Sequence, residues 1–285
     1  MLEYSKVGEY GGEIRLGLLS PCIASISSGG LVAATTECGT VPHVVIWSVE
    51  TGRELCLLSG MELPAFSRCG TKLACIGFSD PHWGMLHVYD VATRTCSWSG
   101  VRNDNTGCWY ASLTGVLWSP DDRMLVECSN RFVRFYDASD GSVIARVECA
   151  CFSALFSDDG SSLFIGSQGA VVKLDVATLT PWVMCHVGSP CDCIKLSGYN
   201  QDAGLLFVFN FDVVAVDCRR KRVVSRMVAQ SNASLLGASC TADGRYMICM
   251  GYKGGPSGDT HRFTTVHDMA KCVEYVQGKR TREQE

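Results

Sequence analysis

The chain has 285 residues, of which 47% are hydrophobic and 19% are charged, and its 25 basic against 29 acidic side chains give a net charge of -4. This composition supplies a large core and argues against a disordered chain. The acidic balance argues against a surface that binds nucleic acid generally, because phosphate recognition depends on clustered Lys and Arg. Since no basic and then apolar N-terminal signal and no bilayer-spanning run is present, the sequence predicts a cytoplasmic protein, with the nucleus as the alternative.

Short apolar runs separated by polar turns recur in six copies along the chain. The most regular copy spans 116–141, where one run ends in Ser119-Pro120-Asp121-Asp122, a second covers 124–128, and a third ends in Tyr136-Asp137. Three strands and two turns fit this pattern. The predicted first strands are 22–27, 63–67, 115–119, 151–157, 193–197 and 237–241. The predicted second strands are 31–35, 73–78, 124–128, 163–167, 205–209 and 246–250.

The third strand of each copy ends on a recognisable pair, in most copies an apolar or aromatic residue followed by Asp. These pairs are Trp47-Ser48, Tyr89-Asp90, Tyr136-Asp137, Leu174-Asp175, Val216-Asp217 and His267-Asp268. They recur every 40 to 50 residues or so, which is the period of propeller blades. With fourth strands such as 54–58, 143–147 and 223–228, the sequence predicts an all-β fold, a β-propeller of four-stranded antiparallel blades with six blades visible.

These motifs resemble the WD40 repeat family over 13–278, between an N-terminal extension (1–12) and a polar C-terminal tail (279–285). Ser119-Pro120-Asp121-Asp122 is similar to the family's SPDG turn, and the strand-ending pairs are similar to its Trp-Asp. Trp occurs in that position only at Trp47, and the family's Gly-His pair is absent from all six copies. The resemblance therefore implies a divergent WD40-like propeller.

The blade count leaves alternatives open, because 14–19 also has the pattern of a fourth strand while 272–277 already supplies one to the last copy. The N-terminal strand can displace or flank the last strand of a six-bladed ring. It can instead belong to an open or incomplete seven-bladed ring that a strand- or blade-donating partner completes by β-augmentation. The third alternative is that one blade is misassigned.

Loop lengths place the predicted binding side on the face where second strands connect to third strands. These connections are longer in copies one (37–43), two (79–85) and six (253–262), and the longest fourth-to-first connection, 100–112, opens on the same face. Trp, Tyr and Arg dominate interaction hot spots. The candidate partner-binding residues are His43, His82, Trp83, Arg102, Trp109, Tyr110, Lys253, His261 and Arg262. The competing interpretation is that Trp83 and Trp109 cap the ends of their own blades.

The 17 cysteines are interpreted as reduced. Cys75, Cys128, Cys218 and Cys249 have the pattern of small core residues. The Cys149/Cys151 and Cys191/Cys193 pairs could hold zinc, but aligning Ser157 with Ser197 staggers the pairs by two residues. Burial of these cysteines against the central channel is therefore expected, and no metal or other cofactor is predicted.

We expect a non-enzymatic scaffold or adaptor of an intracellular complex that binds protein partners, with no small-molecule substrate, no direct nucleic-acid binding and no membrane. The alternative is a six-bladed, metal-assisted lactone or ester hydrolase with Asn130, Gln168 and Asn210 at the channel mouth. Asn also favours hairpin turns for local backbone reasons, and no acidic residue recurs beside this set.

Overall fold

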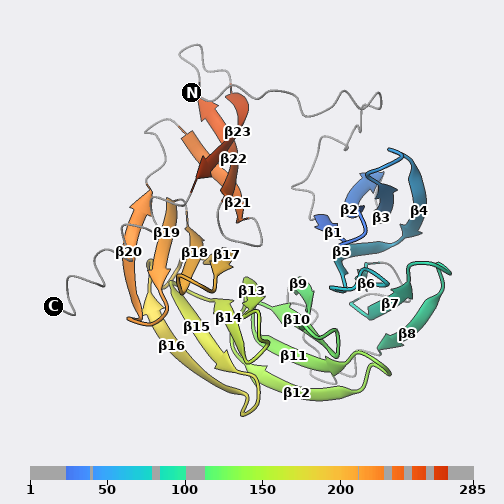
Figure 1. Ribbon diagram of the computed structural model, residues 1–285, viewed down its shortest axis with the longest axis horizontal. Coiled ribbons are helices and arrows are strands. Elements are labelled where there is room, and N and C mark those ends of the chain that lie inside the picture. Colours follow the sequence, from blue (N-terminus) through green and yellow to red (C-terminus); the bar gives the residue numbers. More distant parts are fainter. Residues whose placement is uncertain are drawn as a thin grey trace. The chain divides into compact units, whose positions relative to one another are not determined.

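The computed structural model describes residues 24–38, 41–78, 84–100, 113–210, 212–227, 233–240, 246–254 and 260–268. Every regular element in these ranges is a β-strand, as Figure 1 shows. Within the same ranges there is no helix long and apolar enough to cross a membrane. The strands form six antiparallel sheets, five of four strands and one of three, in which the strands lie in sequence order. The fold is thus all-β and of the β-propeller type, with six blade sheets as predicted.

The first three sheets cover the N-terminal half of the described chain. The first comprises β1 (Ala24–Ile26), β2 (Leu31–Cys38), β3 (Val41–Ser48) and β4 (Glu54–Ser59). The second comprises β5 (Met61–Phe66), β6 (Lys72–Gly77), β7 (Leu86–Asp90) and β8 (Cys96–Gly100). The third comprises β9 (Leu113–Trp118), β10 (Met124–Ser129), β11 (Phe132–Asp137) and β12 (Val143–Glu148).

The remaining sheets follow the same plan. The fourth comprises β13 (Ser153–Phe156), β14 (Ser162–Gly166), β15 (Ala170–Asp175) and β16 (Thr180–His186). The fifth comprises β17 (Lys195–Asn200), β18 (Leu205–Asn210), β19 (Asp212–Asp217) and β20 (Arg222–Met227). The sixth comprises β21 (Ala233–Cys240), β22 (Tyr246–Gly254) and β23 (Thr260–Asp268). All six third strands end on the residues predicted from the sequence.

The chain forms two compact units, and the division between them passes through the third sheet. The first unit holds the first two sheets and the end of the third sheet around 116–126 and 136–144. The second unit holds the other end of the third sheet and the last three sheets. Inside each unit the first strands of consecutive sheets contact each other, β1 with β5 in one and β13 with β17 and β17 with β21 in the other. Side-by-side first strands are what a blade arrangement requires.

Two turns recur in the sheets with nearly constant backbone geometry. The residue that closes the first-to-second turn has a positive φ in five copies, at Gly30, Gly70, Asp122, Gly160 and Gly204. The third-to-fourth turn repeats this at Gly52, Arg94, Gly141, Leu179 and Lys221. Gly adopts such a φ at no steric cost, whereas other residues require compensation. Gly therefore recurs at the end of the first-to-second turn in four of the sheets.

A buried serine hydroxyl stabilises the first-to-second turn in four sheets. Ser67 Oγ accepts a hydrogen bond of 3.0 Å from the Lys72 amide, and Ser119 Oγ accepts one of 2.9 Å from the Met124 amide. Ser27 and Ser157 accept equivalent bonds in the first and fourth sheets. The hydroxyl thus satisfies a backbone donor that the turn would leave without a partner.

Two tryptophans join the second and third sheets within the first unit. The Trp118 indole donates to the Ala65 carbonyl (2.9 Å), and the Trp98 indole donates to the Ala138 carbonyl (2.9 Å). The Trp98 ring also lies so close to Gly141 that a Cβ there would be 2.5 Å from it. These indoles combine apolar packing with a partly buried hydrogen bond.

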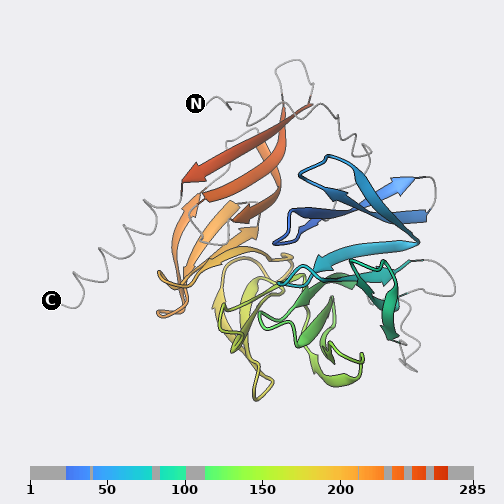
Figure 2. The same cartoon turned by 45° about the vertical axis from the view of Figure 1, so that its right-hand side comes forward.

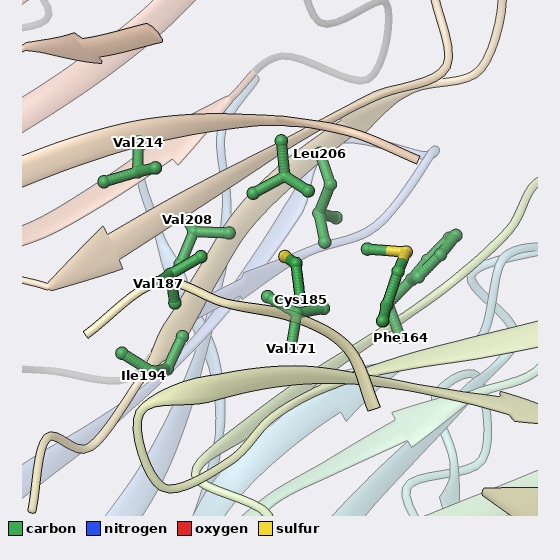
Figure 3. Packing of buried hydrophobic residues seen from close by; sticks show 10 residues of the cluster. Phe164, Val171, Cys185, Val187, Ile194, Leu206, Val208 and Val214 are labelled. Carbon is green, nitrogen blue, oxygen red and sulfur yellow. The ribbon is translucent and has the colours of Figure 1, made fainter. Parts of the chain in front are cut away.

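One core cluster of the second unit lies between the fourth and fifth sheets, and another joins the fifth sheet to Met247 and Cys249 of the sixth. Figure 3 shows Phe164 and Val171 from the fourth sheet facing Leu206, Val208 and Val214 from the fifth. All five are fully or almost fully buried. Strands such as Leu205–Asn210 read as continuous apolar runs because both of their faces are covered.

The fifth copy corrects the predicted alignment of Ser197 with Ser157. Its first-to-second turn is closed by the Gly204 amide bonding to the Gln201 carbonyl, as Gly160 bonds to Ser157, so Gln201 is the equivalent residue. Ser197 instead lies in strand β17, where the pairing register shifts between Leu196 and Gly198. The bulge adds one residue and β17 continues to Asn200, which the sequence spacing could not show. The predicted strands 14–19 and 272–277 lie outside the described residues, as do the ends 1–12 and 279–285.

Candidate protein-interaction surface

The hairpins between second and third strands differ in length, as the sequence predicted. The extra length lies in the strands rather than in the loops that join them. In the third and fourth sheets these hairpins turn over 130–131 and 167–169. In the first sheet β2 and β3 each have eight residues, and in the sixth sheet β22 and β23 each have nine. The described residues of the expected long loops 37–43 and 253–262 are ladder-paired strand, which corrects the prediction there, while 39–40 and 255–259 lie outside the described residues. A paired hairpin presents its side chains at a fixed register, whereas a loop does not.

The hairpin of the first sheet places His43 inside strand β3. His43 pairs with Thr36, and the ladder continues through Glu37 with Pro42 to Cys38 with Val41. The His43 side chain is half-buried, and its buried Nδ1 has no hydrogen-bond partner among the described residues. The neighbouring Pro42 carbonyl accepts a hydrogen bond of 2.9 Å from the Gly60 amide, which ties the hairpin to the start of the second sheet.

The hairpin of the sixth sheet carries three of the candidate residues close to its end. Lys253 pairs directly with His261, and Tyr252 pairs with Arg262. The ladder extends one step further, to Gly254 with Thr260. The strands of this hairpin, in orange to red in Figure 2, are the longest described in the chain. Lys, His and Arg thus gather at one end of a single paired hairpin.

The other candidates cannot be placed. His82 and Trp83 lie outside the described residues, as do Arg102, Trp109 and Tyr110, so the choice between exposed and blade-capping tryptophans stays a prediction. The structure describes the second-sheet hairpin on both sides of residues 79–83, and there the Gly84 amide donates a hydrogen bond to the Gly77 carbonyl (2.7 Å).

The two Cys-x-Cys pairs occupy different environments. Cys151 is fully buried and Cys149 is half-buried, whereas Cys191 and Cys193 are exposed. The expected burial is therefore wrong for the second pair. Because Gln201, not Ser197, is the turn residue, Cys191 and Cys193 lie in the connection before β17 rather than in a strand. A hydrogen bond with Cys128, together with burial, raises the pKa of Cys151 well above its usual value. Such a thiol is an inert packing residue.

The predicted core cysteines are confirmed in three of four cases. Cys75, Cys128 and Cys249 are buried, and Cys218 is half-buried. Burial raises the pKa of Cys218 to about 12. Within the described part of the chain, no three His, Cys, Asp or Glu side chains gather in an arrangement that could hold a metal ion.

The residues of the hydrolase alternative sit in unlike surroundings. Asn130 is half-buried, with a buried Oδ1 that has no hydrogen-bond partner in the described ranges, while Gln168 is exposed. Gln168 pairs through its backbone with Cys193, which places it beside the connection that precedes β17. The side chain of Asn210 is outside the described set.

Comparison with known proteins supports the fold. No family model and no curated protein matches the chain. Among 1016 matching chains of solved structures is the Kuenenia stuttgartiensis hydrazine synthase, with a TM-score of 0.58 and 16% sequence identity. The match covers 73% of this chain and 63% of that one, so it spans less than two thirds of the neighbour's length. At this identity the likeness concerns the fold alone.

Proposed function

We propose that the chain is a divergent WD40-repeat-like propeller and a non-enzymatic protein-interaction scaffold or adaptor subunit of an intracellular complex. The turn chemistry supports the family assignment. The Asp that ends a third strand caps the following turn, as Asp90 does for Thr93 (2.9 Å) and Asp175 does for Thr178 (2.8 Å). The Ser hydroxyl of the first turn recurs in four sheets with the same backbone partner.

The extended hairpins carry the functional proposal. Their ladders exceed those of the other sheets, and in the sixth sheet the extension holds Lys253, His261 and Arg262. A paired backbone fixes the register of these residues in advance, so that less backbone conformational entropy is lost when a partner binds. Blade sheets need no such extension for their own packing. Binding a protein partner is the role that this excess length fits.

Affinity purification from cells with mass spectrometry of the bound proteins tests the proposal. The triple variant Lys253→Ala/His261→Ala/Arg262→Ala should lose at least one partner about tenfold or more, since hot-spot side chains contribute upwards of about 1 kcal/mol each. His43→Ala and Trp83→Ala/Trp109→Ala test the other candidates in the same way. Gln168→Ala, at the tip of a short hairpin, is the matched control and should retain all partners. Full retention by every hairpin and loop variant, with unchanged melting temperatures, would rule out this surface.

A further inference from the structure

The third-to-fourth turn of the fifth sheet carries four consecutive basic residues, Arg219 to Arg222. Arg219, Lys221 and Arg222 are exposed and Arg220 is half-exposed. The buried Asp217 carboxylate accepts hydrogen bonds from the amides of Arg219 (2.9 Å) and Arg220 (3.1 Å). Lys221 closes the turn with a φ of 57°. The backbone under these cations is therefore fixed.

Two neighbouring features position the basic side chains. Lys221 Nζ lies 4.4 Å from the centroid of the Trp182 ring on strand β16, which is a cation–π contact. The Arg219 side chain runs over Gly204, where an added Cβ would lie 3.2 Å from Arg219 Nε. The first-to-second turn thus leaves room for the arginine, and the outer strand of the neighbouring sheet holds the lysine. Both arrangements reduce the entropy that the side chains would lose on binding.

The fold does not require these charges. The residues equivalent to Arg219–Arg222 are Ala177-Thr178-Leu179-Thr180 in the fourth sheet and Ser139-Asp140-Gly141-Ser142 in the third, yet both turns also have a positive φ at their third residue. Four of the chain's 25 basic residues stand in these four positions, although the net charge is -4. The basic turn is therefore an addition to the blade rather than part of its geometry.

Carboxylates close to this turn limit what it can bind. Asp158 and Asp159 are exposed on the first-to-second turn of the fourth sheet, and their charges act on Tyr199 together with that of Arg219. Asp158 donates its amide to Gln201 Oε1 (3.0 Å), and the exposed Asp202 follows directly. These acids flank the cations and would repel a long polyanion. A nucleic acid that binds by its backbone needs cations over many phosphates, whereas a short acidic peptide needs only the turn.

We propose that the Arg219–Arg222 turn is a docking site for a short acidic segment of a partner protein. This site is independent of the extended hairpins. The arginines supply charge-assisted, forked hydrogen bonds to carboxylates, and Lys221 on Trp182 supplies a charge backed by an apolar surface. Such contacts respond to salt, because the exposed charges are screened as ionic strength rises.

The full chain and a fluorescein-labelled peptide of alternating Asp and Glu provide the assay, by fluorescence anisotropy at about 50 and 300 mM salt. The test variant is Arg219→Ala/Arg220→Thr/Lys221→Leu, which copies the turn of the fourth sheet and therefore has a backbone that this fold already adopts. We expect it to weaken peptide binding about tenfold or more. Arg53→Ala/Arg68→Ala/Arg123→Ala removes three exposed charges from the first unit and should bind as the wild type does. A charge-preserving variant, Arg219→Lys/Arg220→Lys, should keep most of the affinity.

The contrary outcomes are distinct. Equal losses in the test and control variants would show general charge attraction and overturn the site. No binding by the wild type at low salt would leave the cations as a solvated edge that discourages strand pairing. Tighter binding of phosphatidylserine vesicles or of single-stranded RNA than of the peptide, lost in the same variant, would overturn the proposed occupant. If the test variant melts well below the wild type, Arg219→Glu alone takes its place, and retained peptide binding by that variant would refute the proposal.

Discussion

Asp122 offers a test of how the turns connect neighbouring sheets, because it occupies a position that four other sheets give to Gly. Its φ is 58°, and a left-handed conformation costs a residue other than Gly roughly 1 kcal/mol, somewhat less for Asp. Its carboxylate accepts hydrogen bonds from the amides of Arg68 (2.6 Å) and Cys69 (2.9 Å) in the corresponding turn of the second sheet. The strain is thus offset by a bridge between two sheets.

Replacing Asp122 by Gly should therefore destabilise the protein, although it restores the residue typical of the turn. Two hydrogen bonds to a carboxylate contribute about 1.5 kcal/mol each, or about 3 kcal/mol together, less whatever solvent exposure removes. Relief of backbone strain returns about 1 kcal/mol, so the net loss is about 2 kcal/mol. Asp122→Asn keeps one acceptor oxygen and tolerance of the turn, and should lose about half as much.

Arg94→Gly is the matched control. Arg94 has a φ of 59° in a third-to-fourth turn and is exposed, and its side chain makes no intersheet hydrogen bond to any residue that the structure describes. Here Gly should be neutral or stabilising by up to about 1 kcal/mol. Calorimetric melting should then show Asp122→Gly several degrees below the wild type and Arg94→Gly at or above it, since about 1 kcal/mol shifts a domain of this size by roughly 2–4 °C. An Asp122→Gly protein as stable as the wild type would refute the bridging role.

Acid should loosen the second sheet's third-to-fourth turn, because the Thr93 amide, the Lys72 ammonium and the Thr93 hydroxyl lower the pKa of Asp90 to about 2. The stability that this carboxylate contributes is complete above its usual pKa of 3.8 and is lost as the pH falls toward 2. The melting temperature of Asp90→Asn should therefore depend less steeply on pH in that window than that of the wild type. Identical slopes of melting temperature against pH would contradict this. Iodoacetamide should label the exposed Cys191 and Cys193 in the native protein, as read by mass spectrometry. It should label the buried Cys75 and Cys185 only after denaturation, because burial shields both thiols and raises their pKa. Early labelling of Cys185 would show that its strand opens readily. Gly166→Ala should destabilise the protein by about 3 kcal/mol or more, since its Cβ would lie 2.2 Å from the Ile194 carbonyl oxygen, and soluble expression with a wild-type melting temperature would refute that tight contact.

The sequence was sufficient for what repeats and insufficient for what departs from the repeat. The pairs such as Tyr136-Asp137 located all six third-strand ends, because an Asp, or Ser48 in the first sheet, that accepts a hydrogen bond in the next turn is a local signal. The Ser197 alignment failed because Ser-Gly also favours a turn, and only strand pairing shows that the residue sits in a bulge. The first-unit tryptophans Trp98 and Trp118 were passed over, since a spacing pattern cannot indicate that an indole reaches the next sheet.

The extended hairpins of the first and sixth sheets were predicted in location but not in form, and their role in binding stays a prediction. Loop length indicated which sheets carry extensions, yet apolar periodicity is too weak in 37–43 and 253–262 to show that the strands continue. His43 illustrates the limit, because its half-buried state depends on the ladder with Thr36 and on the contact of Pro42 with Gly60. The basic turn at Arg219 was visible as a charge run, but its fixed backbone and the Trp182 contact require the structure.

The connection from β16 to β17 folds so closely over the β14–β15 hairpin that Gly166 and Gly169 have no space for any side chain. A Cβ on Gly169 would lie 2.3 Å from the Ser189 carbonyl oxygen, and its φ of 64° also disfavours other residues. In a deep mutational scan these two positions would therefore be among the least tolerant in the chain while touching no partner. Intolerance at these two glycines would report on how the hairpin packs under the connection. Only substitutions of exposed side chains on the connection, such as Cys191 and Cys193, would be informative about binding.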